Sequence, residues 1–398
     1  MQIHTKAVHA GDRKKPGAHT PVTTPIYTAT SYFYDSMEQL DRIFGNEEAG
    51  YCYSRYDNPS AGALEELIAS LENGAAALAC SSGMAAIHTA ILSALNDRPK
   101  SIVAGSALYG QSVTLLMSVL APLGIEVRFA DACDPDALRA AVAEAKPGCV
   151  YVESISNPLL RVPPLDTVAQ ITRDAGAALV VDHTFATPML ARPLDLGAQF
   201  SVHSVTKYLA GHGDVLGGVV VSDAEHAQTM RAFGRNIGPV LGPFECYLTM
   251  RGIKTFPLRM ERQCANACRV AQWLAAHPRV SRVYFPGDPA HPDAATVARL
   301  FPPGMAGAMV SFEIKDAGHD EVFRFMDSLG LIVRATSLGD VHTMMLYPVM
   351  SSHRELSPKH RQRMGINDNL VRLSVGIEAA EDIMADLAQA LTPTPPVR

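Results

Sequence analysis

Short apolar runs, several of them rich in valine, recur through the first two-thirds of the chain, and helix-like segments separate many of them. An unbroken apolar run bounded by polar residues is typical of a strand buried on both faces of a sheet. We expect such strands at 101–105, 149–154, 178–183, 200–204 and 217–223. The stretches 134–145 and 165–176 have amphipathic helical patterns. Strands that alternate with helices predict βαβ units.

This alternation of strands and helices predicts an α/β fold with a large, mostly parallel sheet covered by helices on both faces. A change of composition at 250–274 indicates a long helix that leaves this sheet. Beyond it, 307–316, 331–339 and 369–378 are expected to be strands of a smaller α+β unit.

The first sixty residues are rich in proline, glycine, tyrosine and threonine and show little periodicity. Long ordered arms of this kind often reach a partner subunit. We therefore expect an arm at 1–60, a ligand-binding α/β domain at 61–255 and a C-terminal α+β domain at 256–398.

Composition narrows the class of protein. The 398 residues are 47% hydrophobic and 19% charged, as in an ordinary soluble enzyme. A net charge of -6 gives no basic surface for nucleic acid or anionic lipid. No apolar run is long enough for a membrane span, and the first residues lack the apolar stretch of a signal peptide, which favours a cytoplasmic location.

The seven cysteines are irregularly spaced and do not indicate a disulfide framework. Cys264 and Cys268 stand four apart in a helical pattern, but no CxxC pair or matching histidines accompany them. We interpret them as small buried helix residues and expect no metal site.

Polar residues directly follow several of the expected strands, among them Glu153, Asp182 and Ser204. Ligands of parallel sheets gather at the carboxyl ends of the strands. Lys207 follows Ser204 by three residues. A lysine with a lowered pKa at such a position can form a Schiff base. Asp182 can cap a helix, form an ion pair, or hold a proton on a heteroaromatic nitrogen.

Three segments carry groups that can bind an anion. Gly83, preceded by two serines, opens an apolar helix, although such a start is by itself more often a simple N-cap. Ser204 and Thr206 add hydroxyls, and Tyr53 with Arg55 adds a donor and a cation. The GHGDVLGG stretch lacks the spacing of a dinucleotide site, so its glycines are interpreted as a turn. A phosphate site, a carboxylate and a lysine together indicate pyridoxal phosphate (PLP).

The chain resembles the Cys/Met-metabolism group of PLP enzymes, which includes cystathionine γ-synthase, cystathionine γ- and β-lyases, methionine γ-lyase and O-acetylhomoserine sulfhydrylase. The resemblance runs nearly end to end. It rests on the ordered motifs YCYSRYDNPS, SSGMAA, ESISNPLL, VDHTFATPML and HSVTKYLAGHGDVLGG. It implies PLP fold type I, an amino-acid substrate, and a homotetramer built from two dimers that share their active sites.

The resemblance also implies residue roles. Lys207 would carry PLP as a Schiff base, and Asp182 would face the pyridinium nitrogen. The phosphate would be bound by a set of donors comprising Ser204, Thr206, the backbone of Gly83 and Met84, and Tyr53 and Arg55 of the neighbouring subunit.

For the substrate, the resemblance implies that Tyr109 stacks on the cofactor ring and acts as an acid and base. Arg372 would bind the α-carboxylate as a bidentate pair, helped by Asn157 and Ser337. The alternatives are core packing for Tyr109 and a surface salt bridge for Arg372.

This sequence departs from the family pattern at several positions. His183 replaces the asparagine of VDNTF, and Gln111 occupies the position of the methionine γ-lyase cysteine. Asp340 and His342 replace the second glycine and the glutamate of SLGGxE. Asp340 and His342 either form a solvated loop pair or, together with Gln111, recognise a polar or cationic group of the substrate, such as the guanidinium of canavanine.

The expected function is therefore a PLP-dependent γ-lyase that eliminates the Cγ substituent of a sulfur amino acid or of a polar or cationic γ-substituted one. The alternative is a γ-replacement transferase of the cystathionine γ-synthase or O-acyl-homoserine sulfhydrylase type. Both reactions share a vinylglycine-type intermediate, so the sequence does not separate them. The complete set of expected cofactor residues argues against a catalytically idle binding protein.

Overall fold

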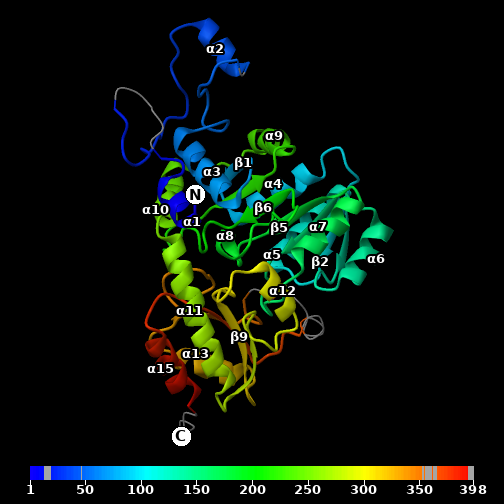
Figure 1. Cartoon of the computed structure of the whole chain (residues 1–398), viewed down its shortest axis with the longest axis vertical. Helices are drawn as coiled ribbons and strands as arrows, with labels where there is room; N and C mark the ends of the chain where they lie inside the picture. The colour runs from blue at the N-terminus through cyan, green and yellow to red at the C-terminus, as the bar shows by residue number, and fades with distance from the viewer. Residues whose placement is uncertain (13–18, 46, 352–353, 355–360, 362–364, 393–398) are drawn as a thin grey trace.

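The computed structural model describes residues 1–12, 19–45, 47–351, 354, 361 and 365–392. These residues form a seven-stranded and a five-stranded sheet. In Figure 1 the larger sheet occupies the centre of the molecule and the smaller one lies below it. The segment that carries α2 (Met37–Phe44) projects from the top.

The larger sheet confirms the predicted α/β fold. Its strands, in spatial order, are β1 (Ala76–Cys80), β7 (Gly218–Ser222), β6 (Phe200–His203), β5 (Ala178–Asp182), β4 (Cys149–Glu153), β2 (Ser101–Gly105) and β3 (Glu126–Ala130). Only β7 runs antiparallel to its neighbours in this sheet. The five expected strands are all present, and each end lies within one residue of the prediction.

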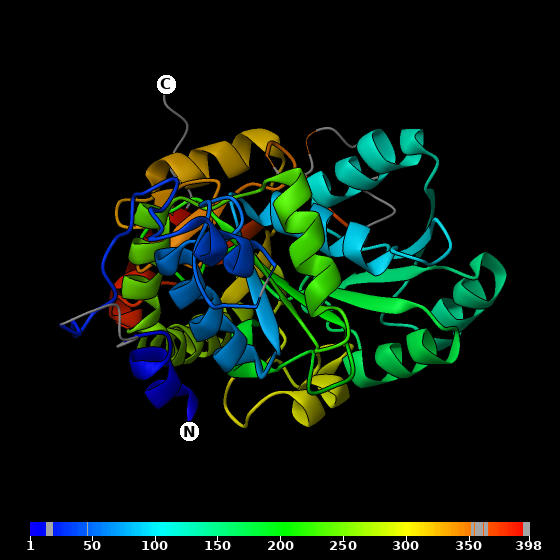
Figure 2. The same ribbon diagram turned by 90° about the horizontal axis from the view of Figure 1, so that it is seen from above.

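Helices cover both faces of this sheet (Figure 2). The longer ones are α3 (Pro59–Glu72), α4 (Gly83–Ala94), α6 (Pro135–Ala145), α7 (Leu165–Asp174), α9 (Ala227–Ile237) and α10 (Pro243–Ile253). Shorter elements are α1 (Ile3–His9), α5 (Gly110–Thr114), a π-helical turn (Leu115–Leu120), a 3-10 turn (Ala121–Leu123) and α8 (Thr187–Leu190). Successive residues of β4 point to opposite faces, so Tyr151 packs with α4 and Val150 and Val152 pack with α6 and α7.

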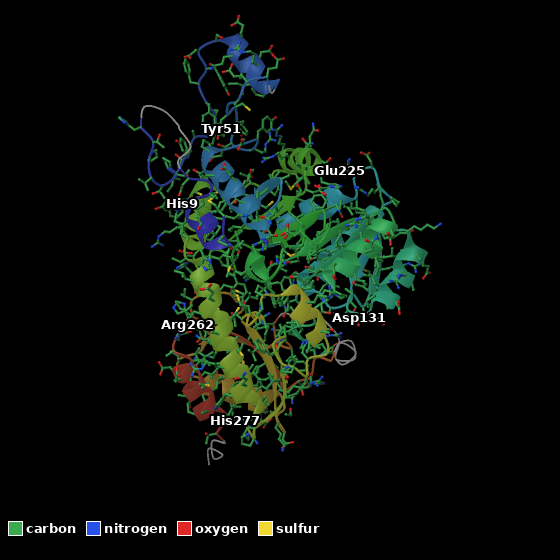
Figure 3. All side chains as sticks on the ribbon, in the orientation of Figure 1. His9, Tyr51, Asp131, Glu225, Arg262 and His277 are labelled. Atoms are coloured by element: carbon green, nitrogen blue, oxygen red, sulfur yellow. The ribbon has the colours of Figure 1, made fainter. Side chains whose placement is uncertain are left out.

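The smaller sheet is mostly antiparallel. Its strands, in spatial order, are β10 (Val333–Arg334), β11 (Met344–Leu346), β12 (Leu370–Ser374), β9 (Met309–Ile314) and β8 (Val280–Tyr284). The accompanying helices are α11 (Phe256–Ala275), α12 (Ala294–Leu300), α13 (His319–Ser328) and α15 (Ala380–Leu391). Figure 3 shows α11 running down one side of the molecule, with Arg262 along it and His277 just past its end.

Two expectations about the C-terminal half were wrong in detail. The segment 250–274 is not one helix, because α10 ends at Ile253 and α11 begins at Phe256. Pro257 explains the break, since proline is tolerated in the first turn of a helix and not in its interior. The segment 331–339 contains only the two-residue strand β10 and continues as a loop.

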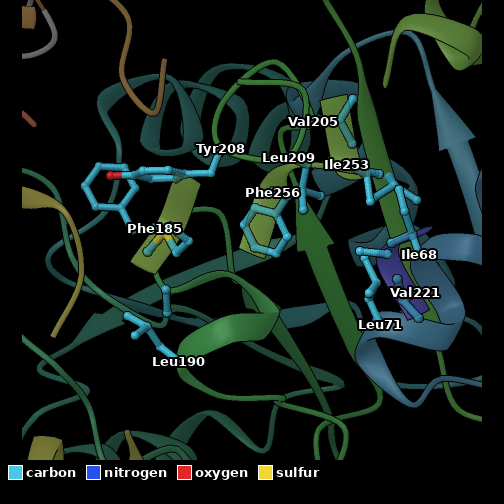
Figure 4. Packing of buried hydrophobic residues seen from close by; sticks show 14 of the residues in the cluster. Ile68, Leu71, Phe185, Leu190, Val205, Tyr208, Leu209, Val221, Ile253 and Phe256 are labelled. Carbon is cyan, nitrogen blue, oxygen red and sulfur yellow. The ribbon is translucent and has the colours of Figure 1, made fainter. Parts of the chain in front are cut away.

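Buried side chains anchor the turn that contains Lys207. Val205, Tyr208 and Leu209 belong to one hydrophobic cluster together with Ile253 and Phe256 (Figure 4). Because these neighbours are buried, the turn after β6 has a fixed position. Within the part of the chain that the structure describes, no helix has both the length and the apolar character of a membrane span.

Candidate active site

A cavity of about 450 Å³ lies at the carboxyl ends of β4, β5 and β6. It brings together ten of the residues expected at the site, namely Gly83, Met84, Tyr109, Gln111, Asn157, Asp182, Ser204, Thr206, Lys207 and Arg372. Parallel strands whose carboxyl ends meet at one edge of the sheet explain why residues distant in sequence converge here.

Lys207 follows β6 and reaches into the cavity. Its Nζ donates a hydrogen bond to Oγ of Ser337 at 2.9 Å. Burial, together with the charge of Arg372, lowers the pKa of Lys207 to about 8. The amine is therefore deprotonated far more readily than an exposed lysine and can act as a nucleophile.

Two carboxyl groups lie at the ends of neighbouring strands, where Glu153 of β4 pairs with Asp182 of β5. Burial raises the pKa of Asp182, which accepts a hydrogen bond from the backbone N–H of Thr184 at 3.0 Å. Burial and the neighbouring Asp182 raise the pKa of Glu153 well above its ordinary range. A neighbouring cation would lower the pKa of Asp182 and keep its carboxylate ionised, so this position suits a protonated ring nitrogen.

The N-terminus of α4 forms one wall of the cavity. Ser82 caps the helix, because its hydroxyl accepts from the backbone N–H of Ala85 at 3.1 Å. A Cβ added at Gly83 would lie 2.8 Å from Cβ of Ser204, so the close approach requires glycine. The N–H groups that open this helix can bind an anion. The Thr206 hydroxyl donates to the carbonyl of Gly217 at 3.1 Å.

Arg372 lies on β12 and is buried beside the cavity. Its Nη1 donates to Oδ1 of Asn157 at 2.8 Å, and its Nη2 donates to the backbone carbonyl of Ser337 at 3.4 Å. Its Nε has no partner among the described residues. Because Arg372 is buried, the alternative of a surface salt bridge is wrong. Burial lowers the pKa of Arg372 to about 10. The guanidinium therefore stays charged near neutral pH and can bind a carboxylate.

Tyr109 directly precedes α5 and lines the cavity. Its backbone N–H donates to Oε1 of Glu153 at 2.5 Å, which ties α5 to the end of β4. Tyr109 is 38% exposed, so it is not a core-packing residue. Burial nevertheless raises the pKa of its hydroxyl, and Arg372 opposes that shift.

Several expected residues do not line this cavity. Asp340 and His342 contact each other, with 3.2 Å between Oδ1 and Nδ1, and Asp340 is buried. The pair is therefore solvated on one side only, because the side chain of His342 is 64% exposed. His183 is buried next to His203. Burial lowers the pKa of His183 to about 4.

Tyr53 and Arg55 also lie outside the cavity of their own chain. Arg55 stacks over the ring of Tyr56 and donates to the backbone carbonyl of Arg235. Figure 3 shows Tyr51 near the base of the projecting segment that also carries α2.

A family model described as Cys/Met metabolism PLP-dependent enzyme matches residues 4–392. The chain belongs to this family. It is similar to an L-methionine gamma-lyase from Fusobacterium nucleatum subsp. polymorphum, with 41% identity over 98% of both chains. It is also similar to an O-succinylhomoserine sulfhydrylase from Pseudomonas aeruginosa, with 38% identity over 97% of this chain and 94% of the relative.

Solved structures of the Cys/Met metabolism family have the same fold. Cystathionine gamma synthase from Xanthomonas oryzae pv. oryzae aligns with a TM-score of 0.90 and 37% identity over 98% of each chain. A putative O-acetylhomoserine (thiol)-lyase from Campylobacter jejuni, described with pyridoxyl-lysine monophosphate, aligns with a TM-score of 0.91 and 27% identity over 99% and 100% of the two chains. The protein is thus a PLP-dependent enzyme of fold type I.

The residues of the cavity fit PLP. Lys207 is a buried amine of lowered pKa, Asp182 is a carboxyl group that gains from a cationic partner, and the start of α4 offers N–H groups to a phosphate. The glycine at residue 83 keeps open a space that a Cβ would fill.

Some lining residues were not among the expected site residues. They include Thr184, Phe185, Thr336 and Leu338. Glu153 also lines the cavity, as its place after a predicted strand indicated, although no role was assigned to it from the sequence. Thr336 and Leu338 lie in a loop of the structure, but the apolar pattern of 331–339 had predicted a strand there, so they were not expected at the site.

Proposed function

We propose that this protein is a PLP-dependent γ-lyase that eliminates the Cγ substituent of an amino-acid substrate. The observation that carries the proposal is the convergence of Lys207, Asp182 and Arg372 on one cavity. The 41% identity to an L-methionine gamma-lyase supports elimination as the reaction.

Lys207 is the covalent anchor of PLP in this proposal, and Asp182 holds the proton on the ring nitrogen. Bound PLP supplies an electron sink for negative charge that develops on the substrate. The phosphate is held by donors at the start of α4 and after β6, which are Gly83, Met84, Ser204 and Thr206. Thr206 would exchange its hydrogen bond to the Gly217 carbonyl for one to the phosphate.

Arg372 and Asn157 bind the α-carboxylate of the substrate. The bond between these two side chains, at 2.8 Å, orients the guanidinium before the substrate arrives. Ser337 helps to position both cations, because its hydroxyl accepts from Lys207 and its carbonyl accepts from Arg372.

The amine of Lys207 would take the Cα proton of the substrate and deliver it at later positions. Its lowered pKa suits a group that must accept and release protons near neutral pH. Tyr109, which lines the same cavity, would assist as a second acid and base beside the ring of bound PLP. Gln111 lines the same cavity and would contact the distal part of the substrate.

A γ-replacement transferase is the second candidate, supported by the 38% identity to an O-succinylhomoserine sulfhydrylase. The test is product analysis with homoserine esters, with and without an added thiol. A γ-lyase releases a 2-oxo acid and ammonia at the same rate in both cases. Capture of most of the substrate as the thiol adduct would contradict the γ-lyase.

The leaving group is tested with a substrate panel of methionine, cystathionine and canavanine. Among the described lining residues the carboxyl groups are Asp182 and Glu153, and both lie beside the expected cofactor. We therefore favour a sulfur substituent over a guanidinium. Faster release from canavanine than from methionine would reverse that choice.

We further propose that the enzyme is a cytoplasmic homotetramer whose dimers share active sites, with residues 1–60 as the exchanged arm, 61–255 as the PLP-binding domain and 256–398 as the C-terminal domain. Tyr53, which is 46% exposed, and Arg55 would complete the phosphate site of the neighbouring subunit. Phe33, in the same segment, is 92% exposed, as expected for a side chain that a partner covers. All seven cysteines are unpaired, which suits a reducing compartment.

A further inference from the structure

Arg259 of α11 holds the turn that follows Lys207. Its Nη1 donates to the carbonyl of Tyr208 at 2.8 Å, and its Nη2 donates to the carbonyl of Leu209 at 3.1 Å. Nη2 also donates to the carbonyl of Gly252 at 3.0 Å, at the end of α10. The guanidinium is buried, and burial lowers its pKa to about 10. A buried cation bonded to carbonyl oxygens is costly unless a negative charge lies nearby.

Asp340 supplies that negative charge. Its carboxyl group is buried, and its attraction opposes the effect of burial on Arg259. A Cβ built on Gly213 would lie only 2.4 Å from Oδ2 of Asp340, so the carboxylate abuts the end of the same turn. Gly213 has a φ of +70°, which also favours glycine at this position.

The backbone around Asp340 is bound to this turn as well. The N–H of Val341 donates to the carbonyl of Gly211 at 3.0 Å. A Cβ on Gly339 would lie 2.6 Å from the backbone nitrogen of Tyr208, so the two segments are in direct contact. Gln263 of α11 donates to the carbonyl of Asp340 at 2.7 Å. The loop that starts at Ser337 is therefore held by the same helix that holds the lysine turn.

We propose that Asp340 is a positioning residue for Lys207. By balancing the charge of Arg259, Asp340 fixes the turn 207–213 against the loop 337–342, and so sets the contact between Lys207 and Ser337. This role differs from recognition of a cationic substrate by Asp340. It rests on the proposed function only in that Lys207 carries the cofactor.

The test uses the PLP-loaded variant Asp340→Asn, which keeps the size of the side chain and removes its charge. The visible absorbance of bound PLP is titrated with pH, and kcat and KM are measured with methionine and with canavanine. We expect the absorbance midpoint to move to lower pH, because an unbalanced Arg259 cation disfavours a proton on the Lys207 nitrogen. We expect kcat to fall by about 10-fold for every substrate that the wild type turns over, with KM nearly unchanged.

The matched control is Asp386→Asn. Asp386 is another buried aspartate of the C-terminal part, and it accepts from the N–H groups of Gly330, Leu331 and Ile332 at 2.8, 2.9 and 2.8 Å. Its loss should lower thermal stability and leave the absorbance midpoint unchanged. This variant separates positioning of Lys207 from general destabilisation.

A rise in KM confined to canavanine, with an unchanged absorbance midpoint, would overturn the proposal in favour of substrate recognition. An Asp340→Asn enzyme that matches the wild type in both readouts would also overturn it. If Asp340→Asn does not fold, Asp340→Gly is titrated in its place, and the same midpoint shift is expected. The titration needs no turnover, so it tests the role of Asp340 even if the proposed γ-elimination is wrong.

Discussion

At the scale of single residues, the chemistry of the site depends on burial and on the nearest charge. Burial and the nearby charge of Arg372 together lower the pKa of Lys207 to about 8. The neutral amine is the form that attacks the aldehyde of PLP. The fraction of Lys207 that is neutral at a given pH therefore depends on the burial of the cavity and on its charges.

We predict that incorporation of PLP into the apoenzyme accelerates with pH and levels off above about 8, the pKa of Lys207. Arg372→Met should move that midpoint upward, because it removes a neighbouring positive charge. Stopped-flow absorbance at a series of pH values measures the rate. Arg139→Met, on the exposed surface of α6, is the control and should leave the profile unchanged. An Arg372→Met midpoint at or below the wild-type value would count against this account of the lowered pKa.

A second residue-scale prediction concerns Glu72, which is buried and accepts from Nε2 of His203 at 2.5 Å. Burial raises the pKa of Glu72, but the charge and hydrogen bond of His203 outweigh it, so the net shift is downward. The stabilisation is therefore fully present above the unfolded-state pKa and is lost as pH falls through the lower folded-state value. We expect Glu72→Gln to reduce the free energy of unfolding by about 3 kcal/mol near pH 7.

Urea unfolding of the wild type and of Glu72→Gln at several pH values measures this difference, which should shrink in acid. Glu144→Gln is the control, since the ion pair of Glu144 with Arg128 is solvent-exposed. A difference between wild type and Glu72→Gln that does not change with pH would show that the charge of Glu72 is not the cause.

At the scale of elements, the start of α4 combines a capped helix with a close approach to the turn after β6. Ser82 satisfies the N–H of Ala85, and Gly83 and Met84 at the start of the same helix line the cavity, where their N–H groups can bind an anion. The same few residues thus stabilise the helix and shape the ligand site.

Gly83→Ala should weaken PLP binding by at least about 10-fold, because the added methyl group would contact Ser204 and push α4 away from the phosphate. The helix itself should not suffer, since alanine is the better helix former. Equilibrium dialysis or fluorescence titration of the apoenzyme measures the affinity. Gly62→Ala in α3 is the matched control, because its nearest non-local atom lies at 3.5 Å. Equal PLP affinity in all three proteins would rule out steric crowding at Gly83.

At the scale of the whole molecule, the segment around α2 stands away from the two sheets (Figure 1). In contrast, α1 packs against α3 and α11. The chain is thus held at its start, whereas Phe33, in the segment that precedes α2, is exposed. An exposed aromatic side chain of this kind is typical of a surface that contacts a partner.

Shared sites predict complementation between two inactive variants. Arg55→Ala lacks the phosphate cation that we assign to the neighbouring site, and Lys207→Ala lacks the anchor of its own site. Mixed, unfolded and refolded together, the two should form hybrids with some intact sites and recover about a quarter of the wild-type activity at a 1:1 ratio. Activity in the mixture no higher than the sum of the two separate variants would contradict shared sites, and light scattering of each sample reports the oligomeric state.

The local pattern of the sequence was sufficient for much of the larger sheet. The runs that form β2 and β4 to β7 are apolar enough to be buried on both faces, and each was predicted within one residue. β1 was missed because its sequence AALAC is dominated by alanine, which has little strand preference. The antiparallel direction of β7 was not predictable either, since an apolar run contains no information about the direction of its partner.

The sequence by itself determined the family and the reactive groups, because a lysine, an aspartate and an arginine in recognisable motifs keep their chemistry wherever the chain places them. Only the tertiary structure decided how they act. Ser337 meets Lys207 across 130 residues of sequence, and the carboxylate of Asp340 is buried against the lysine turn instead of lining the cavity. Local periodicity cannot specify such contacts, since they depend on how two sheets and α11 pack together in space.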